Sequence, residues 1–179
     1  FNNLHIYSNT SAADSSLYVD RTCNQSTILE KLKPYPISIE GSYSNTHTIK
    51  VFIDYNNNGI FDSSELVLYD LLPTATGTVT IPDSALLNVP LRMRVIADNP
   101  SMPDSTRPCR LGGTLADGAG QVEDYSIFVV KRNVFSVVSG NWNSPPTWSC
   151  NCIPNYDDQV TIKAGHTVVV TAAMGQFRC

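Results

Sequence analysis

Short segments in which apolar and polar residues alternate recur along the first two thirds of the chain. Alternation with a period of two predicts strands that bury one face. Clusters of Gly, Pro, Asn and Asp separate these segments and are typical of turns. The predicted strands cover residues 37–40, 48–55, 65–69, 76–81, 91–97 and 124–130. Only 26–32 and 82–87 resemble helical turns, so the pattern predicts an all-β protein built around a β-sandwich.

A second region begins near residue 132. Residues 134–138 are largely apolar, and 160–162 and 167–171 are further short strand candidates, joined by a turn at 163–166. The stretch 133–179 is too short to build a secure core alone. We therefore predict two domains: an Ig- or jelly-roll-like sandwich at 1–132 and an incomplete β domain at 133–179. Because the chain starts at Phe1 in the middle of a pattern, we expect a processed or excerpted fragment.

Composition narrows the functional classes. The chain is 42% hydrophobic and 16% charged, with a net charge of −4, so an ordinary core can form. Its Lys and Arg residues are scattered rather than clustered, which argues against a nucleic-acid partner. No apolar stretch approaches the length of a membrane span.

Residues 54–65 read DYNNNGIFDSSE and have the spacing of a twelve-residue calcium loop. Ca²⁺ is a hard cation that takes six to eight oxygen ligands, and alternate residues of a tight loop can point inward together. Gly59 supplies the sharp turn at the sixth place. The expected ligands are Asp54, Asn56, Asn58, the Ile60 carbonyl, Asp62 and Glu65.

The alternative is an exposed Asn-Gly turn between two strands, since Asn58-Gly59 is also a hairpin signal. That alternative does not explain why four further oxygen-bearing residues occupy ligand places. The flanking segments are strands, so we expect a structural calcium site with an affinity of about 10⁻⁴–10⁻³ M rather than a helix-opening sensor.

Two motifs carry a family resemblance. Residues 49–66, IKVFIDYNNNGIFDSSEL, are similar to the strand and calcium loop of the GEVED domain, and 120–127, GQVEDYSI, look like its signature. Residues 91–97 and Pro108-Cys109 follow the same order, so the resemblance covers roughly residues 1–130. Gln121 stands where that family usually has Glu.

The resemblance implies a β-sandwich accessory module of secreted and cell-surface proteins, many from Bacteroidota and exported by the type IX route. Such modules accompany metalloproteases and adhesins. Glu123 and Asp124 keep the acidic part of the signature and could add ligands or charge to the calcium site. The alternative is a solvated acidic turn before the last strand.

The second region resembles the opening of secreted right-handed β-helix or G-rich β-repeat domains. It carries SGNWNSPPTWS, a proline-containing turn and VTIKAGHTVVV. We expect Trp142 and Trp148 to cap the first coil as packed aromatics, and stacking on a sugar or cofactor is the alternative.

The five cysteines show no zinc spacing. Disulfides in an oxidising compartment are expected, with free buried thiols as the alternative. We predict a Cys23–Cys109 bond in the sandwich. We also predict a bond from Cys152, or less readily from Cys150, to Cys179, because a Cys150–Cys152 bond would close a very tight ring.

Two serines fit an O-glycan pattern of exported Bacteroidota proteins, namely Ser84 in Asp-Ser-Ala and Ser105 in Asp-Ser-Thr. Ordinary loop serines are the alternative, and in either case both tripeptides should be exposed.

No nucleophile elbow, zinc-protease helix or phosphate loop is present. His166 is expected to be a hydrogen-bonded turn residue, and the adjacent Asp157 and Asp158 point to opposite faces if extended. We therefore expect a non-catalytic accessory or adhesion module, extracellular, whose partners are other domains of its chain or a cell-surface glycan or protein. Alternatives are the accessory region of a secreted hydrolase whose catalytic domain lies elsewhere, and a calcium-stiffened spacer.

Overall fold

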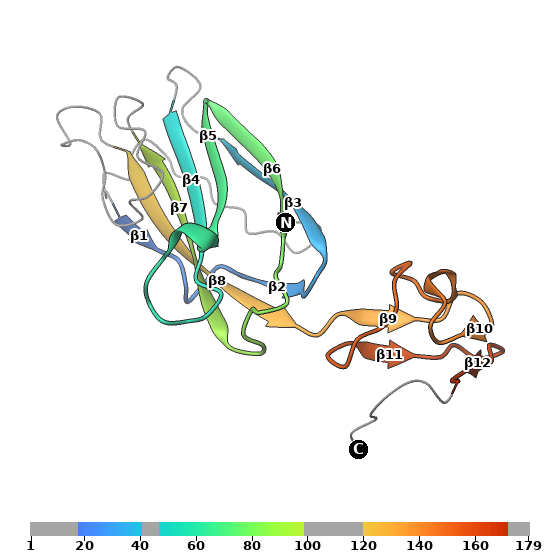
Figure 1. Cartoon of the computed structure of the whole chain (residues 1–179). Coiled ribbons are helices and arrows are strands. Elements are labelled where there is room, and N and C mark those ends of the chain that lie inside the picture. Colours follow the sequence, from blue (N-terminus) through green and yellow to red (C-terminus); the bar gives the residue numbers. More distant parts are fainter. Residues whose placement is uncertain (1–17, 41–46, 99–119, 172–179) are drawn as a thin grey trace. The chain divides into compact units, whose positions relative to one another are not determined.

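The computed structural model describes residues 18–40, 47–98 and 120–171, and it is all-β (Figure 1). The chain divides into two compact units, Phe1–Val130 and Lys131–Cys179. Within the described ranges the only helical segments are short 3₁₀ turns. No helix in these ranges is long and apolar enough to cross a membrane.

The larger sheet of the first unit has six strands. Along its main path the order is β1-β8-β7-β4-β5, and β2 also pairs with β8. The pairs β5–β4, β4–β7 and β7–β8 are antiparallel, whereas β1 and β2 run parallel to successive parts of β8. The strands are β1 Tyr18–Asp20, β2 Ser26–Glu30, β4 His47–Ile53, β5 Leu66–Leu72, β7 Pro90–Asp98 and β8 Gln121–Val130.

A second sheet pairs β3 (Pro34–Glu40) with β6 (Thr74–Thr80) in antiparallel register. One face of each sheet contributes to a shared core, because alternate residues of each strand are apolar and point to the same side. Burying one such side chain stabilises the fold by about 1.5–3 kcal/mol. The core includes Leu29, Tyr35, Ile37, Val51, Ile53, Val79, Ile81, Leu91, Met93, Tyr125, Ile127 and Val129. The predicted β-sandwich is therefore confirmed.

The opposite face of the six-stranded sheet is also buried, but it has a mixed character. A small apolar cluster joins Phe52, Phe61, Ile96 and Val122, with Leu66 packed against it. Polar and charged side chains on the same face are equally buried, and they include Thr48, Lys50, Asp98 and Asp124. Buried charges are tolerated only where partners satisfy them, so this face depends on specific polar contacts.

All six strands predicted in the first region exist, with bounds that differ by a few residues. The predicted helical turn at 26–32 is wrong, because Ser26–Glu30 is strand β2. Its pairing with β8 buries Thr27 and Leu29 on alternate positions, and this tertiary pairing outweighs the local preference. Residues 82–87 form an irregular turn closed by a hydrogen bond from the Ala85 N–H to the Pro82 carbonyl, rather than a helical segment.

The second unit contains two short parallel pairs. Strand β9 (Asn133–Phe135) pairs with β11 (Gln159–Thr161), and β10 (Gly140–Asn141) pairs with β12 (Val168–Val169). The chain therefore passes through β9 and β10 and then returns, so that β11 and β12 run beside them in the same direction. Whether this coil opens a longer β-helix stays a prediction.

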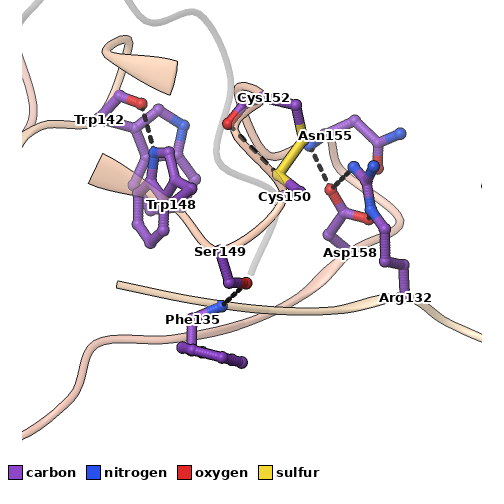
Figure 2. Close-up of a disulfide and its surroundings, with 9 residues drawn as sticks. All are labelled: Arg132, Phe135, Trp142, Trp148, Ser149, Cys150, Cys152, Asn155 and Asp158. Atoms are coloured by element: carbon purple, nitrogen blue, oxygen red, sulfur yellow. Dashed lines mark hydrogen bonds and ion pairs between the residues drawn. A yellow bond between two sulfur atoms is a disulfide. The ribbon is translucent and has the colours of Figure 1, made fainter. Parts of the chain in front are cut away.

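A tryptophan pair fills the turn region of this coil, as expected. The Trp142 and Trp148 rings meet edge to face with centroids 4.9 Å apart, and the Trp148 indole N–H donates to the Trp142 carbonyl at 2.7 Å (Figure 2). Trp148 is only 2% exposed, so its ring is a packing element and not a stacking platform. Nearby, Pro145–Thr147 forms the 3₁₀ turn η3.

A bidentate ion pair closes the start of the unit. The Arg132 guanidinium contacts both carboxylate oxygens of Asp158, with Nε–Oδ1 at 2.9 Å and Nη2–Oδ2 at 2.6 Å (Figure 2). Asp158 also accepts the Asn155 N–H at 2.9 Å. Because Gln159 follows Asp158, this pair fixes the start of β11 against the chain entering β9.

The predicted Cys152–Cys179 bond is wrong, since Cys152 is bonded to Cys150 (Figure 2). We expected the one-residue spacing to be too tight. Asn151 adopts a left-handed backbone with φ of 48°, which folds the Cys-Asn-Cys segment into a turn and brings the two Cα atoms to 5.1 Å. Cys179 lies outside the described residues.

In the first unit, Cys23 lies in the turn after β1 and is an exposed free thiol. Its expected partner, Cys109, lies outside the described residues. The free thiol of Cys23 does not support the predicted Cys23–Cys109 bond.

Peptide mapping of the unreduced protein should find Cys150 joined to Cys152, and Cys23 should react readily with a thiol reagent because it is exposed. A peptide that links Cys152 to Cys179 would contradict the observed pairing. A Cys23 that resists labelling until reduction would instead restore the predicted Cys23–Cys109 bond.

Gly120 precedes β8 where two backbones approach closely. A Cβ built on it would lie 1.6 Å from the Ala97 carbonyl oxygen, and main-chain atoms cannot swing aside as a side chain would. Glycine at this place is therefore a packing requirement that permits β8 to pair with β7.

Gly120→Ala should destabilise the first unit by about 3 kcal/mol, because the added methyl group forces two strands apart. Urea unfolding of the full chain measures this loss. Gly59→Ala is the comparison, since nothing lies within 4 Å of its added Cβ. Equal losses for the two variants would show that the close approach is unimportant.

Candidate metal site

The candidate loop connects two neighbouring strands of the six-stranded sheet. Strand β4 ends at Ile53, and β5 begins at Leu66 after a 3₁₀ turn, η1 (Ser63–Glu65). Because β4 and β5 are paired antiparallel up to Phe52↔Leu66, the two ends of the loop meet at the end of this pair. Asp54 and Glu65 occupy those ends and are only 3% and 2% exposed.

The middle of the loop turns through two left-handed residues. Asn57 has a φ of 53° and Gly59 a φ of 80°. Asparagine and glycine tolerate this region better than other residues. The predicted turn at Gly59 is confirmed, and residues 56–60 are exposed around it.

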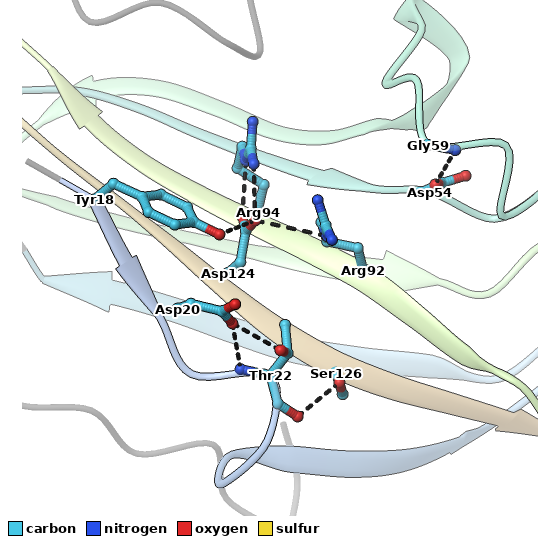
Figure 3. A network of polar contacts seen from close by, with 9 residues as sticks. All are labelled: Tyr18, Asp20, Thr22, Asp54, Gly59, Arg92, Arg94, Asp124 and Ser126. Atoms are coloured by element: carbon cyan, nitrogen blue, oxygen red, sulfur yellow. Dashed lines mark hydrogen bonds and ion pairs between the residues drawn. The ribbon is translucent and has the colours of Figure 1, made fainter.

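The side chains of the first half of the loop are directed at its own backbone. Asp54 accepts the Asn58 N–H at 3.1 Å and the Gly59 N–H at 2.9 Å, each with a different oxygen (Figure 3 shows the bond to Gly59). Asn56 accepts the Asn58 N–H at 2.9 Å, and Asn58 accepts the Ile60 N–H at 2.8 Å. These bonds tie the side-chain oxygens of Asp54, Asn56 and Asn58 to N–H groups of the loop itself.

The second half closes as a capping box. Asp62 caps η1 by accepting the Ser64 N–H at 2.7 Å. The hydrogen bond from the Ser64 hydroxyl, followed by this backbone contact, lowers the pKa of Asp62. Glu65 reaches back to accept the Asp62 N–H at 3.2 Å and, across the loop, the Tyr55 N–H at 2.9 Å. One carboxylate therefore bridges both ends of the loop.

No described Lys or Arg forms an ion pair with Asp54, Asp62 or Glu65. Burial raises the pKa of Glu65, and the nearby carboxylates of Asp62 and Asp54 add to that increase. The phenol of buried Tyr55 offers no positive charge, and burial followed by the charge of Glu65 raises its pKa as well. Among the described residues, backbone N–H groups and the Ser64 hydroxyl are the donors to these three carboxylates, so the loop gathers negative charge that no ion pair neutralises.

The two end carboxylates of the loop keep acceptor capacity beyond the hydrogen bonds that they make. An ionised carboxylate has about four lone-pair sites, and Asp54 and Glu65 each use two on the loop backbone. The described ranges contain no group of three or more His, Cys, Asp or Glu side chains arranged to hold a metal ion. A calcium shell here would therefore also need the amide oxygens of Asn56 and Asn58 and the Ile60 carbonyl.

The structure does not support Glu123 and Asp124 as further ligands. Asp124 is fully buried and accepts two bonds from Arg94, Nε–Oδ1 and Nη2–Oδ2, both at 2.7 Å. Tyr18 donates to it at 3.0 Å, and Arg92 lies 3.6 Å away (Figure 3). Glu123 pairs with Arg21 and accepts the Tyr125 hydroxyl. Arginines already neutralise both carboxylates, which leaves little attraction for a cation.

Sequence reasoning missed a connection between this acidic pair and the loop. The Arg94 guanidinium that Asp124 holds also lies over the ring of Phe61, with its central carbon 5.1 Å from the ring centroid. Phe61 belongs to the candidate loop and packs on Phe52 at 5.7 Å. Spacing could not reveal this contact because Arg94 lies far from both motifs in the sequence.

Residues 48–128 match the family model of the GEVED domain. The first unit contains a GEVED domain. The match spans β4 to β8 and therefore includes the candidate loop, Arg94 and Asp124. A search of curated proteins and a search of solved structures found no match.

Other predicted site residues belong to other segments of the chain. Ser84 is exposed in the turn before β7, but Ala85 of the same tripeptide is only 2% exposed and belongs to the core, so the predicted exposure of the whole tripeptide is wrong. Ser105 lies outside the described residues. In the second unit, His166 closes a turn and its Nδ1 lies 2.8 Å from the Ser136 hydroxyl. Ser136 is fully buried and accepts the Lys163 N–H, so the expected structural role of His166 is confirmed.

Replacing Gly59 of the GEVED domain with alanine should cost about 1–2 kcal/mol in unfolding free energy. The cost is purely conformational, because φ is 80° and the space around the added methyl is open. Gly59→Asn should cost less, since asparagine tolerates this backbone region. Equal stability of the alanine variant and the parent protein, measured by urea unfolding, would contradict the turn geometry.

Proposed function

We propose that the first unit is a non-catalytic, calcium-stabilised accessory or adhesion module of a secreted or cell-surface protein. The observation that carries the proposal is the pair of buried carboxylates, Asp54 and Glu65, at the two ends of one loop, without a basic partner among the described residues. Burying unpaired charge is costly, and a bound cation would remove that cost.

The ligands would be Asp54, Asn56, Asn58, the Ile60 carbonyl, Asp62 and Glu65. Calcium supplies a positive charge that draws these oxygens together. The loop itself orients them, because its hydrogen bonds already hold the four predicted side chains of its two ends and first half in place. Asp62 is exposed and occupied by its cap, which suits contact through a water molecule.

The role of such a site would be structural. A cation held between the end of β4 and the start of β5 would fasten two strands of the central sheet. A ligand that binds only the folded state stabilises it by RT ln(1 + [L]/Kd). Calcium at about 1 mM outside cells would keep a site with a Kd of about 10⁻⁴–10⁻³ M about half to nine-tenths occupied.

Two further observations support the accessory role and the location. The acidic and histidine residues that could suggest catalysis, namely Asp124, Asp158 and His166, each serve a structural contact. The Cys150–Cys152 disulfide favours an oxidising compartment, as outside the cell. Partners would then be neighbouring domains of the same chain or a surface glycan or protein.

Removing calcium with a chelator should lower the melting temperature of the first unit, and adding calcium back should restore it. At ten to a hundred times Kd, calcium should stabilise the folded state by about 1.4–2.7 kcal/mol, because only the folded loop binds it. Calorimetry measures both the shift and the affinity. Magnesium at equal concentration should give a smaller shift, because it demands a tighter octahedral shell.

Glu65→Gln and Asp54→Asn should remove the calcium response, since each deletes a buried carboxylate. Asp83→Asn is the matched control, because Asp83 lies in the same unit, pairs with Lys31 and is not one of the proposed ligands. A parent protein whose melting curve ignores both chelator and calcium would end the proposal.

A further inference from the structure

One cross-strand row links the candidate loop to the acidic strand. Phe52 of β4 lies opposite Arg94 of β7, and Arg94 lies opposite Asp124 of β8. Residues opposite one another in a sheet project from the same face and touch. The register therefore places Arg94 between an aromatic residue near the start of the loop and a buried carboxylate.

Asp124 fixes the orientation of Arg94. The bidentate contact locks the plane of the guanidinium, and the carboxylate has no exposed surface through which water could compete. The Tyr18 hydroxyl occupies a further site on the same carboxylate. Only 12% of the Arg94 side chain is exposed, so it has little freedom to move.

The fixed guanidinium in turn holds Phe61. It lies between two rings, 5.1 Å from the centroid of Phe61 and 5.9 Å from that of Tyr18. Phe61 is 9% exposed and also packs against Phe52, Ile96 and Val122. It is the single buried anchor between residues 56 and 64 of the otherwise exposed loop.

Phe61 lies next to two of the proposed ligands in the sequence, so its position affects theirs. Phe61 is flanked by Ile60, whose carbonyl is a proposed ligand, and by Asp62, which caps η1 and donates its N–H to Glu65. Displacing the ring would shift the backbone on both sides of it.

We propose that Arg94, held by Asp124, is a positioning residue that sets the calcium affinity of the loop through Phe61. This inference rests on the proposed calcium function. It gives the buried aspartate of the GEVED domain a role as a clamp on the loop and not as a ligand.

Lysine cannot replace arginine in this role. It lacks the planar fork that meets both oxygens of Asp124 and stacks flat on an aromatic ring. Arg94→Lys keeps the charge and removes the clamp, whereas Phe61→Leu keeps the ion pair and removes the ring on which it acts. The chain also offers a matched control in Arg132→Lys, since Arg132 makes a similar bidentate pair with Asp158 in the second unit.

The experiment measures two quantities in the full chain. Calorimetric titration gives the calcium affinity, and amide hydrogen exchange in the calcium-free protein gives the protection of the Asn58, Gly59 and Asp62 N–H groups. We expect Arg94→Lys and Phe61→Leu each to weaken calcium binding by about tenfold or more and to speed exchange at these amides. Arg132→Lys should leave both quantities unchanged.

Parent-like affinity and loop exchange in both variants would overturn the inference. If the parent chain binds no calcium, the proposed function fails, and exchange in the calcium-free variants still decides whether Arg94 orders the loop. If Arg94→Lys does not fold, Phe61→Leu decides the question alone, because its ion pair is intact.

Discussion

The pairing of β4 with β5 on one side and β7 on the other is the constraint on which the first unit depends. It brings together the two ends of the twelve-residue loop 54–65, so that Glu65 can accept the Tyr55 N–H. The same register aligns Phe52, Arg94 and Asp124 across three strands. The loop and β8 are therefore connected through Arg94, although a long stretch of sequence separates them.

Buried carboxylates in this unit are satisfied in two different ways. Asp124 has arginine partners and a tyrosine donor, so its charge is neutralised within the protein. Within the described ranges, Asp54 and Glu65 have only backbone N–H donors, whose partial charges orient a carboxylate without neutralising it. This difference separates a structural ion pair from a candidate cation site, and it is invisible in the composition of either motif.

The second unit has a small core and is held together by a few local contacts. A disulfide, an aromatic pair and a bidentate ion pair each tie together segments near the turn region, while the strands themselves are only two or three residues long. Short parallel pairs bury little surface, so such contacts supply order that a larger domain would obtain from packing.

Strand periodicity in the sequence determined the all-β class and six strands of the first unit, because apolar and polar residues alternate along a strand that is buried on one face. Loop spacing likewise determined the turn at Gly59, since a left-handed backbone position demands particular residues. The strand β2 was missed because its identity depends on β8, a partner distant in sequence.

The partners of the charged residues were decided only by the tertiary structure. Glu123 and Asp124 read as possible ligands because sequence shows a carboxylate but not its partner, which is Arg21 for Glu123 and, on the neighbouring strand, Arg94 for Asp124. The Cys150–Cys152 bond was rejected on ring size because sequence does not reveal the left-handed backbone of Asn151. Local backbone preferences follow from the type of each residue and can be read from the sequence. Charge partners and ring closure depend instead on where strand register and backbone angles place atoms in space.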